Sequence, residues 1–105
     1  MAKTLNYDYH IHANIINGAQ NAEKYILRAI ELGLDEICIT DHAPFRHISN
    51  SDRIPFGRLS DYCDEVHRLA EKYSADITVR CGMEIDYHPD LVWEIEDILK
   101  NAKLD

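Results

Sequence analysis

Two histidines stand one residue apart where the first apolar run of this chain ends. His10 and His12 come at the end of a run that begins with residues 5–9, a segment that favours a strand. On an extended strand, residues i and i+2 point to the same face. A single histidine at such a place is more often a hydrogen-bonded structural residue than a ligand. Two imidazoles held side by side at a strand end are half of a metal site.

Two more polar motifs are found at the ends of strand-like runs. Residues 35–40 are rich in β-branched side chains and are followed by Asp41 and His42. Residues 77–85 form a third apolar run, and Glu84 lies near its end. His42 alone could be an exposed loop histidine, and Glu84 alone could cap the following turn. Three such motifs at strand ends together favour one shared metal site.

Helical patterns separate the three strand-like runs. Apolar residues at helical spacing predict a helix over residues 19–32, which Gly33 ends because glycine tolerates the left-handed conformation. Ser60 is expected to cap a second helix, which carries the cleanest amphipathic stripe in the chain. Pro89 opens a last helix, since proline is tolerated in a first helical turn. Residues 42–57 have no clear period and are expected to form a long loop.

The resulting order of elements is strand, helix, strand, helix, strand, helix. This alternation predicts an α/β fold with parallel strands joined by right-handed crossovers. In such folds, ligands bind at the carboxyl ends of the strands, where all three polar motifs lie. Three strands do not close a barrel, and a complete (β/α)8 barrel takes about 250 residues. We therefore expect residues 1–105 to form one unit, the amino-terminal part of a larger barrel.

Charge and cysteine content exclude several classes of protein. The 105 residues include 19 acidic and 11 basic ones, which gives a formal net charge of −8. Such a balance disfavours binding to the phosphate backbone of nucleic acids, which needs lysine and arginine. No apolar stretch approaches the roughly 20 residues of a membrane span. Three cysteines without a CxxC motif indicate reduced thiols and a cytoplasmic protein.

Imidazole and carboxylate ligands together indicate a group of metals and a type of reaction. This ligand set suits Zn, Mn or Fe rather than Ca or Mg. A glutamate such as Glu84 can bridge two ions, because each carboxylate oxygen can bind one. Two bridged ions would bind a phosphate ester and lower the pKa of a bound water from 15.7 to about 7. The expected reaction is therefore phosphoester hydrolysis, with Glu84 as the central catalytic residue.

Three ordered motifs of this chain resemble those of the PHP family (polymerase and histidinol phosphatase). They are Asp8-Tyr9-His10-Ile11-His12, Thr40-Asp41-His42-Ala43-Pro44 and Gly82-Met83-Glu84-Ile85-Asp86-Tyr87. The second and third motifs are most similar to the histidinol-phosphatase branch. The resemblance spans nearly the whole chain and implies a distorted (β/α)7 TIM-like barrel with two or three divalent metal ions. It also implies hydrolysis of a small-molecule phosphate ester, L-histidinol phosphate, in histidine biosynthesis.

The resemblance further implies which residues bind metal. His10, His12 and Glu84 would bind a first ion. His42 would bind a second, and Glu84 would bridge to another ion. The family usually supplies one more ligand a few residues after the first motif, where this chain has Asn17.

Other charged residues in and near the motifs are implied to assist. Three acidic residues would orient the imidazole rings, although each could equally be a surface or capping residue. Three basic residues of the long loop could reach a substrate phosphate, although they could equally be solvated. The acidic residues are Asp8, Asp41 and Asp86, and the basic residues are Arg46, His47 and Arg53.

Two other functions stay open at this point. One is a PHP phosphoesterase that acts on nucleotides or nucleic acid, although the acidic charge weighs against long polymers. The other is a metal-binding module without turnover, because the family's later ligands and phosphate-binding arginines are not found in these 105 residues. A part-barrel would also leave open sheet edges, which invite pairing with a second copy of the chain.

Overall fold

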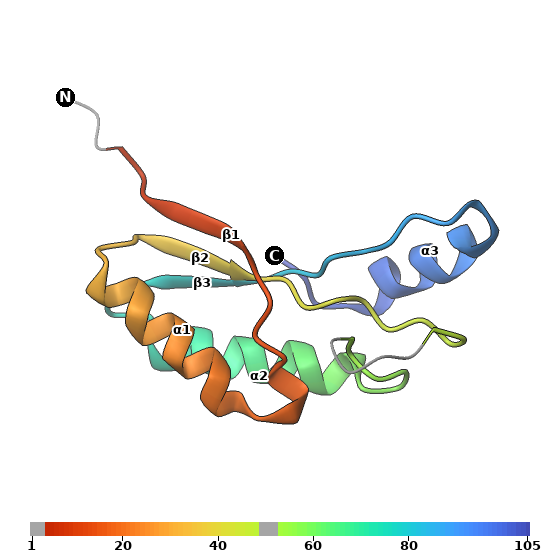
Figure 1. Ribbon diagram of the computed structural model, residues 1–105, viewed down its shortest axis with the longest axis horizontal. Helices are drawn as coiled ribbons and strands as arrows, with labels where there is room; N and C mark the ends of the chain where they lie inside the picture. The colour runs from red at the N-terminus through yellow and green to blue at the C-terminus, as the bar shows by residue number, and fades with distance from the viewer. Residues whose placement is uncertain (1–3, 49–52) are drawn as a thin grey trace.

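The computed structural model describes residues 4–48 and 53–105 and shows an α/β arrangement (Figure 1). Strands and helices alternate along the chain, as the sequence predicts. No helix in these two ranges is long and apolar enough to span a membrane. The elements are β1 (Tyr7–Ile11), the 3-10 helix η1 (Ile15–Asn17), α1 (Ala19–Glu31), β2 (Glu36–Ile39), α2 (Leu59–Lys72), β3 (Thr78–Cys81), the 3-10 helix η2 (Pro89–Leu91) and α3 (Val92–Asn101).

The three strands form one parallel sheet in the order β1, β2, β3. β2 pairs with β3 in a continuous register that begins at Glu36 opposite Thr78 and ends at Ile39 opposite Cys81. After α3 the chain returns to β3, where the Asp105 N–H group donates to the Cys81 carbonyl oxygen at 2.9 Å. Because the strands run in the same direction, their carboxyl ends lie at one edge of the sheet. The three polar motifs therefore come together at that edge.

Helices α1 and α2 cover one face of the sheet, and the main core lies between these two layers (Figure 1). The strands and helices meet there through aliphatic side chains, each of which contributes roughly 1.5–3 kcal/mol when fully buried. This layer fixes the sheet against the helices and leaves the strand ends free to carry polar groups. Its buried members include Ile37, Ile39, Val79 and Cys81 from the strands, and Ala22, Ile26, Tyr62, Val66 and Leu69 from the helices.

Helix α3 stands apart from this core and packs against the segment that follows β2 (Figure 1). Ile98 of α3 forms a second, smaller cluster with Ala43 and Phe45. The predicted loop at residues 42–57 contains no helix or strand in its described part, and residues 49–52 lie outside the described residues. Apolar contacts with α3 thus stabilise the segment that follows His42.

All three strands differ in their bounds from the sequence-based prediction, and the largest differences are in β1 and β3. β1 covers Tyr7–Ile11 rather than residues 5–9, so His10 lies inside the strand. β3 ends at Cys81 instead of continuing to residue 85, because the continuous pairing with β2 stops there. One isolated parallel bridge, between His42 and Glu84, continues the pairing beyond this point.

The helix boundaries confirm one prediction and correct two. Gly33 follows α1 with a φ of 78°, in the left-handed region that glycine favours. Ser60 is not the N-cap of α2, because the helix already begins at Leu59 and has no side-chain cap. Pro89 opens a 3-10 turn, and α3 itself begins at Val92.

Candidate metal centre

Glu84 reaches the site because its main chain continues the β2–β3 pairing beyond the strand ends. The Glu84 N–H group donates to the Asp41 carbonyl oxygen at 3.0 Å, and the Ala43 N–H group donates to the Glu84 carbonyl oxygen at 2.9 Å. These two bonds place Glu84 opposite His42. The hydrogen-bonding register thus brings a carboxylate and an imidazole from different motifs side by side.

A bulge in β1 presents the first two histidines. Asp8 pairs with Ile37 and Ile11 with Ile39, so β1 has one extra residue in this interval. The His10 N–H group within the bulge donates to the Asp8 Oδ1 atom at 3.0 Å. Bulges redirect side chains next to functional sites. The His10 and His12 rings stack here with centroids 4.9 Å apart and planes 11° apart.

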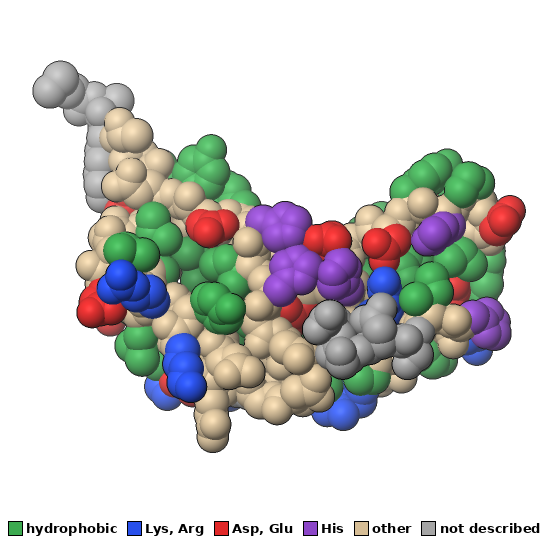
Figure 2. Space-filling view, in the orientation of Figure 1, with side chains coloured by type: hydrophobic (Ala, Val, Ile, Leu, Met, Phe, Trp, Pro, Cys, Tyr) green, Lys and Arg blue, Asp and Glu red, His purple; other side chains and the backbone are tan. Residues whose placement is uncertain are grey.

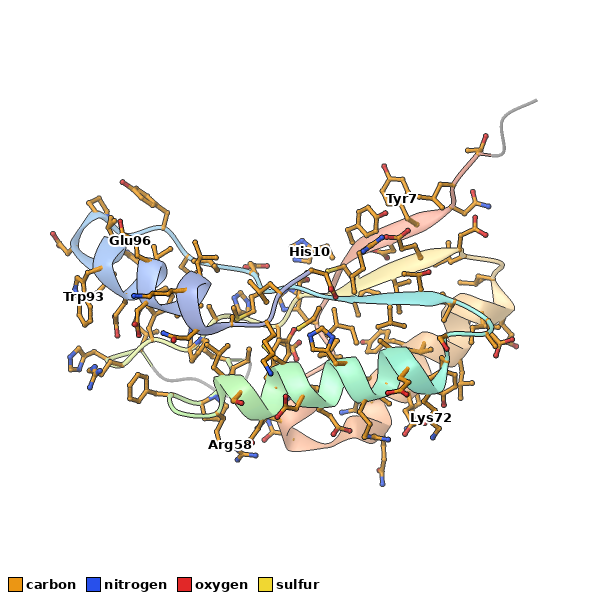
Figure 3. All side chains as sticks on the ribbon, turned by 180° about the vertical axis from the view of Figure 1, so that it is seen from behind. Tyr7, His10, Arg58, Lys72, Trp93 and Glu96 are labelled. Carbon is orange, nitrogen blue, oxygen red and sulfur yellow. The ribbon has the colours of Figure 1, made fainter. Side chains whose placement is uncertain are left out.

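Three ligand atoms from two motifs converge on one point. The Nε2 atom of His10 lies 2.8 Å from Glu84 Oε1, and that of His12 lies 3.0 Å from the same oxygen. The two Nε2 atoms are 2.9 Å apart. Figure 2 shows histidine and acidic side chains gathered at the bottom of a hollow between the sheet and α3. In Figure 3, His10 lies between the strand that carries Tyr7 and the helix that carries Trp93.

The second carboxylate oxygen of Glu84 faces the remaining histidine. Glu84 Oε2 lies 3.2 Å from His42 Nδ1, a buried nitrogen without a well-formed hydrogen bond to the described residues. The His42 ring meets the His12 ring edge-on at 4.7 Å. His42, Glu84 and Asp86 each offer a ligand atom within 4.8 Å of one another. The two oxygens of Glu84 therefore belong to two adjoining groups of ligands.

These groups fit divalent cations. His10 Nε2, His12 Nε2 and Glu84 Oε1 form a triangle with edges of 2.8, 3.0 and 2.9 Å. Ligands about 2.1 Å from an ion and at right angles to one another lie about 3.0 Å apart. A cation would satisfy all three lone pairs at once, whereas two imidazole nitrogens that both donate to Oε1 would repel each other. The buried His42 Nδ1 atom makes no well-formed hydrogen bond within the described residues and offers a further ligand to an ion.

The charges around the site keep its two carboxylates ionised. Burial raises the pKa of Glu84, but the charge of His42 and hydrogen bonds from His12 and His10 outweigh it, so this pKa lies below its ordinary value. The hydrogen bond from Arg53 lowers the pKa of Asp86 in spite of partial burial. Both groups are thus anions at neutral pH, which is the form that binds a cation.

Two of the three aspartates that were expected to orient imidazoles bind the main chain instead. Asp8 accepts the N–H group of His10, as described above. Asp41 is buried and accepts three main-chain N–H groups from the segment that follows His12. In the described part of the chain, neither aspartate is hydrogen-bonded to an imidazole ring. The bulge and the turn leave main-chain N–H groups without main-chain partners. The two carboxylates accept these groups and so satisfy their hydrogen bonding.

Arg53 and Asp86 form an ion pair beside the site. Arg53 Nη2 donates to Asp86 Oδ2 at 2.7 Å, and Nη1 donates to the Ala43 carbonyl oxygen at 2.7 Å. The Arg53 side chain is only 8% exposed. The guanidinium is therefore already engaged within the protein, which differs from the expectation that it grips a substrate phosphate.

The other two residues expected to bind phosphate lie away from the histidines. The Arg46 guanidinium lies 4.6 Å from the centre of the Phe56 ring, and its main-chain N–H group donates to Glu94. His47 is exposed on the same loop. Within residues 4–48 and 53–105, no hydrogen bond or ion pair joins either side chain to the ligand groups. The structure therefore does not bring Arg46 and His47 to the site.

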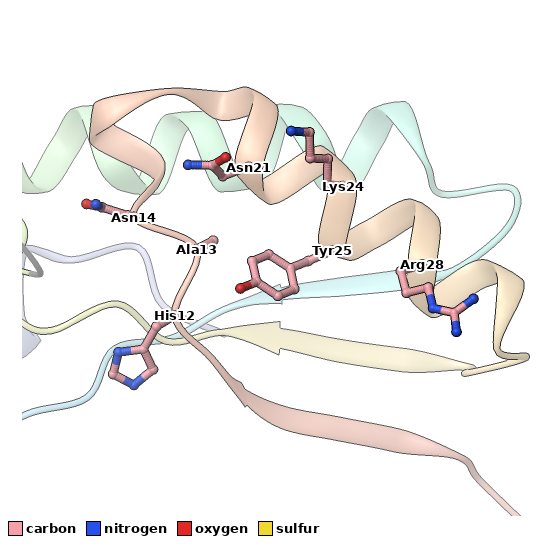
Figure 4. A pocket seen from close by; sticks show the side chains of 7 residues that line it. All are labelled: His12, Ala13, Asn14, Asn21, Lys24, Tyr25 and Arg28. Carbon is pink, nitrogen blue, oxygen red and sulfur yellow. The ribbon is translucent and has the colours of Figure 1, made fainter.

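A cavity of about 500 Å³ opens beside His12, between β1 and α1 (Figure 4). Lys24 and Arg28 of α1 give it a basic side, and Tyr25 adds an aromatic ring. Asn17, which stands where the family usually supplies a ligand, donates to the Asn14 side chain at 2.9 Å instead. The space next to the ligands is thus lined by neutral and basic groups.

Two residues that the sequence pattern did not single out as site residues hold the strand ends together. Gly82 lies so close to β2 that an added Cβ atom would lie 2.7 Å from Cys38 Sγ. Tyr62, predicted only to pack in the core, places its hydroxyl group between β2 and β3. A tyrosine on the apolar stripe of a helix that faces the strand ends is the signal that could have found the second.

Comparison with known proteins decides the family. The model of the PHP domain matches residues 8–104, which is nearly the whole chain. The chain belongs to the PHP domain family. It is 29% identical over 94 residues to a protein of Deinococcus radiodurans named "Probable histidinol-phosphatase", and 27% identical over 99 residues to the histidinol-phosphatase of Lactococcus lactis. These alignments cover 88% and 93% of this PHP chain, but 36% of each relative.

A solved structure supports the fold of this PHP chain. The crystal structure of hisK from Listeria monocytogenes, which carries a provisional histidinol phosphatase assignment, matches with a TM-score of 0.71 and 23% sequence identity. The match covers 92% of this chain and 40% of that one. The chain thus spans between a third and two fifths of the length of the proteins it matches, and its three-stranded parallel sheet has the arrangement of the corresponding part of the solved protein.

Proposed function

We propose that this PHP chain takes part in metal-dependent phosphoester hydrolysis, with L-histidinol phosphate as the substrate and histidine biosynthesis as the pathway. The convergence of His10, His12, His42 and Glu84 at one strand edge carries this proposal. The names of the relatives favour histidinol phosphate among small phosphate esters. We also propose that the chain corresponds to the amino-terminal part of a PHP barrel.

In this proposal, His10, His12 and Glu84 would hold one ion, and His42 with Glu84 would hold another. Zn, Mn or Fe suits this donor set. We propose two or three ions, of which the two adjoining groups of candidate ligands would account for two. When bound, such ions supply a hydroxide at neutral pH and polarise a phosphoryl group. Glu84 keeps both of its oxygens directed at the two histidine groups, and its lowered pKa keeps it ionised. Asp86 offers a further carboxylate oxygen beside His42, and its ion-pair partner Arg53 balances its charge.

A metal-binding module without turnover is the second candidate. Its supporting observation is that the Arg53 guanidinium, which could bind a phosphate, is engaged by Asp86 and Ala43. Hydrolysis of nucleic acid is the weakest candidate, because the net charge of −8 opposes a polyanion. We further propose a cytoplasmic protein, which three free thiols support, and pairing of two copies of the chain through open sheet edges.

A phosphatase assay on the purified chain tests these candidates. The chain is stripped with a chelator, reloaded with Mn²⁺, and assayed for phosphate release from histidinol phosphate and from a panel of nucleotides. Because these 105 residues correspond to part of a PHP barrel, the proposal expects turnover of histidinol phosphate from a complete barrel that contains them, and it expects His12→Ala and Glu84→Gln to abolish that turnover. Bound metal without turnover would support the non-catalytic module, and preference for a nucleotide would overturn the substrate.

A further inference from the structure

Tyr62 connects the ends of two strands through one buried hydroxyl group. The side chain comes from α2 and is fully buried. Its hydroxyl oxygen lies 2.7 Å from the Gly82 carbonyl oxygen and 3.1 Å from that of Ile39, and the Asp41 N–H group donates to it at 3.4 Å. A phenol has a single proton, which goes to the nearer acceptor. Burial raises the pKa of the Tyr62 hydroxyl, so it remains a donor.

Asp41 connects the third strand end to this group. Its carboxylate accepts the N–H groups of Ala13, Asn14 and Ile15 at 2.7, 3.0 and 3.0 Å. Asn14 has a φ of 50°, a left-handed conformation that such convergence of N–H groups stabilises. These residues directly follow His12. Asp41 thus fixes the end of β1 against the end of β2.

The two residues act at the positions where the ligand spacing is set. Tyr62 bonds to the main chain two residues before Glu84, and Asp41 is adjacent to His42 in sequence. A cation needs ligand atoms about 3.0 Å apart, so a displacement of one strand end by a fraction of an ångström separates the ligands. Neither side chain has a polar atom within hydrogen-bond distance of the ligand atoms in the described residues, so both would act only through the main chain.

We propose that Tyr62 and Asp41 are positioning residues of the metal centre, which hold the three strand ends so that the imidazoles and the Glu84 carboxylate converge. This inference rests on the proposed metal-dependent function. It predicts that removal of the Tyr62 hydroxyl weakens metal binding more than removal of another tyrosine hydroxyl that is hydrogen-bonded away from the strand ends. Substitution of a residue that orients a metal ligand without binding the metal itself typically lowers metal affinity about 10–100-fold.

The matched control is Tyr73, at the other end of the same helix. Its hydroxyl donates to Glu23 Oε2 at 2.6 Å, so this bond joins the carboxyl end of α2 to α1. Mn²⁺ affinity is measured by titration calorimetry on the chelator-stripped chain, and unfolding by urea is measured without metal. Tyr62→Phe is expected to weaken Mn²⁺ binding about 10-fold or more, whereas Tyr73→Phe changes it less than about twofold. Equal affinities for the two variants would overturn the inference.

Asp41→Asn provides a second variant if Tyr62→Phe does not fold. Its control is Asp35→Asn, because Asp35 accepts the Asn6 N–H group at 3.0 Å at the opposite end of β2. The inference expects Asp41→Asn alone to weaken Mn²⁺ binding. Unchanged affinity, or failure of both Tyr62→Phe and Asp41→Asn to fold, would contradict a role in positioning. A wild-type chain that binds no Mn²⁺ would instead overturn the metal centre itself, and the inference with it.

Discussion

His42 and Glu84 are paired twice, once through the main chain and once through their side chains. An isolated parallel bridge joins their main chains beyond the ends of β2 and β3, and His42 Nδ1 lies 3.2 Å from Glu84 Oε2. The register of the sheet therefore determines the distance between these two candidate ligands. Substitutions that move the register are expected to change metal affinity even when they leave the ligands in place.

Glu84→Gln tests the carboxylate directly. The amide keeps the shape of the side chain but removes the negative charge and one of the two oxygens that face the histidines. We expect Mn²⁺ affinity to fall by more than the roughly 10–100-fold that loss of an outer partner causes. Titration calorimetry measures the change. Glu31→Gln, which alters a 69%-exposed carboxylate on α1, is the control and should bind as the wild type does.

Gly82→Ala tests the close approach of β3 to β2. The added Cβ atom would lie 2.7 Å from Cys38 Sγ and 3.2 Å from Thr40 Cγ2, so something must shift. We expect a loss of about 1–3 kcal/mol in the free energy of unfolding, measured with urea. The double variant Gly82→Ala/Cys38→Ala removes the nearest atom and should recover part of the loss. A double variant no more stable than Gly82→Ala would show that the sulfur contact is not the cause.

Arg53→Met tests the pH dependence that the Asp86 pair confers. Because the folded-state pKa of Asp86 is lowered, its contribution to stability is present above the unfolded pKa of about 3.8 and is lost as pH falls through the folded value. Arg53→Met removes the largest cause that lowers the pKa of Asp86, so this pKa rises and acid unfolding begins at a higher pH. We expect a loss of about 1–2 kcal/mol at pH 7 and a smaller one near pH 3. An equal loss at both values would contradict this pair as the source.

The alternation of strands and helices could be predicted from sequence because each element has an apolar face of the right period. The bulge in β1 could not, because an aspartate within a strand-like run does not by itself indicate that its carboxylate accepts the N–H group two residues on. The sequence pattern predicts too late an end for β3, because the apolar run continues through Met83 and Ile85. Met83 packs against both apolar clusters, and Ile85 packs against the smaller one.

The convergence of His10, His12, His42 and Glu84 could be predicted because polar groups at the ends of parallel strands meet at one edge. The roles of Asp41 and Arg53 could not. Asp41 serves main-chain N–H groups that only the folded turn leaves unpaired. Arg53 lies in a loop without periodicity, so its burial against Asp86 depends on contacts distant in sequence. Tyr62 has the pattern of a core residue, and its hydroxyl role follows from the strand ends it faces.

Metal binding by the purified chain tests the central claim most directly. Equilibrium dialysis against Mn²⁺ after chelator treatment gives the number of bound ions, and thermal unfolding gives the accompanying stabilisation, about 2.7 kcal/mol at 100 times the dissociation constant. The convergence of His10, His12, His42 and Glu84 predicts at least one ion per wild-type chain and its loss in His12→Ala. A wild-type chain that binds no more Mn²⁺ than His12→Ala would contradict the metal centre.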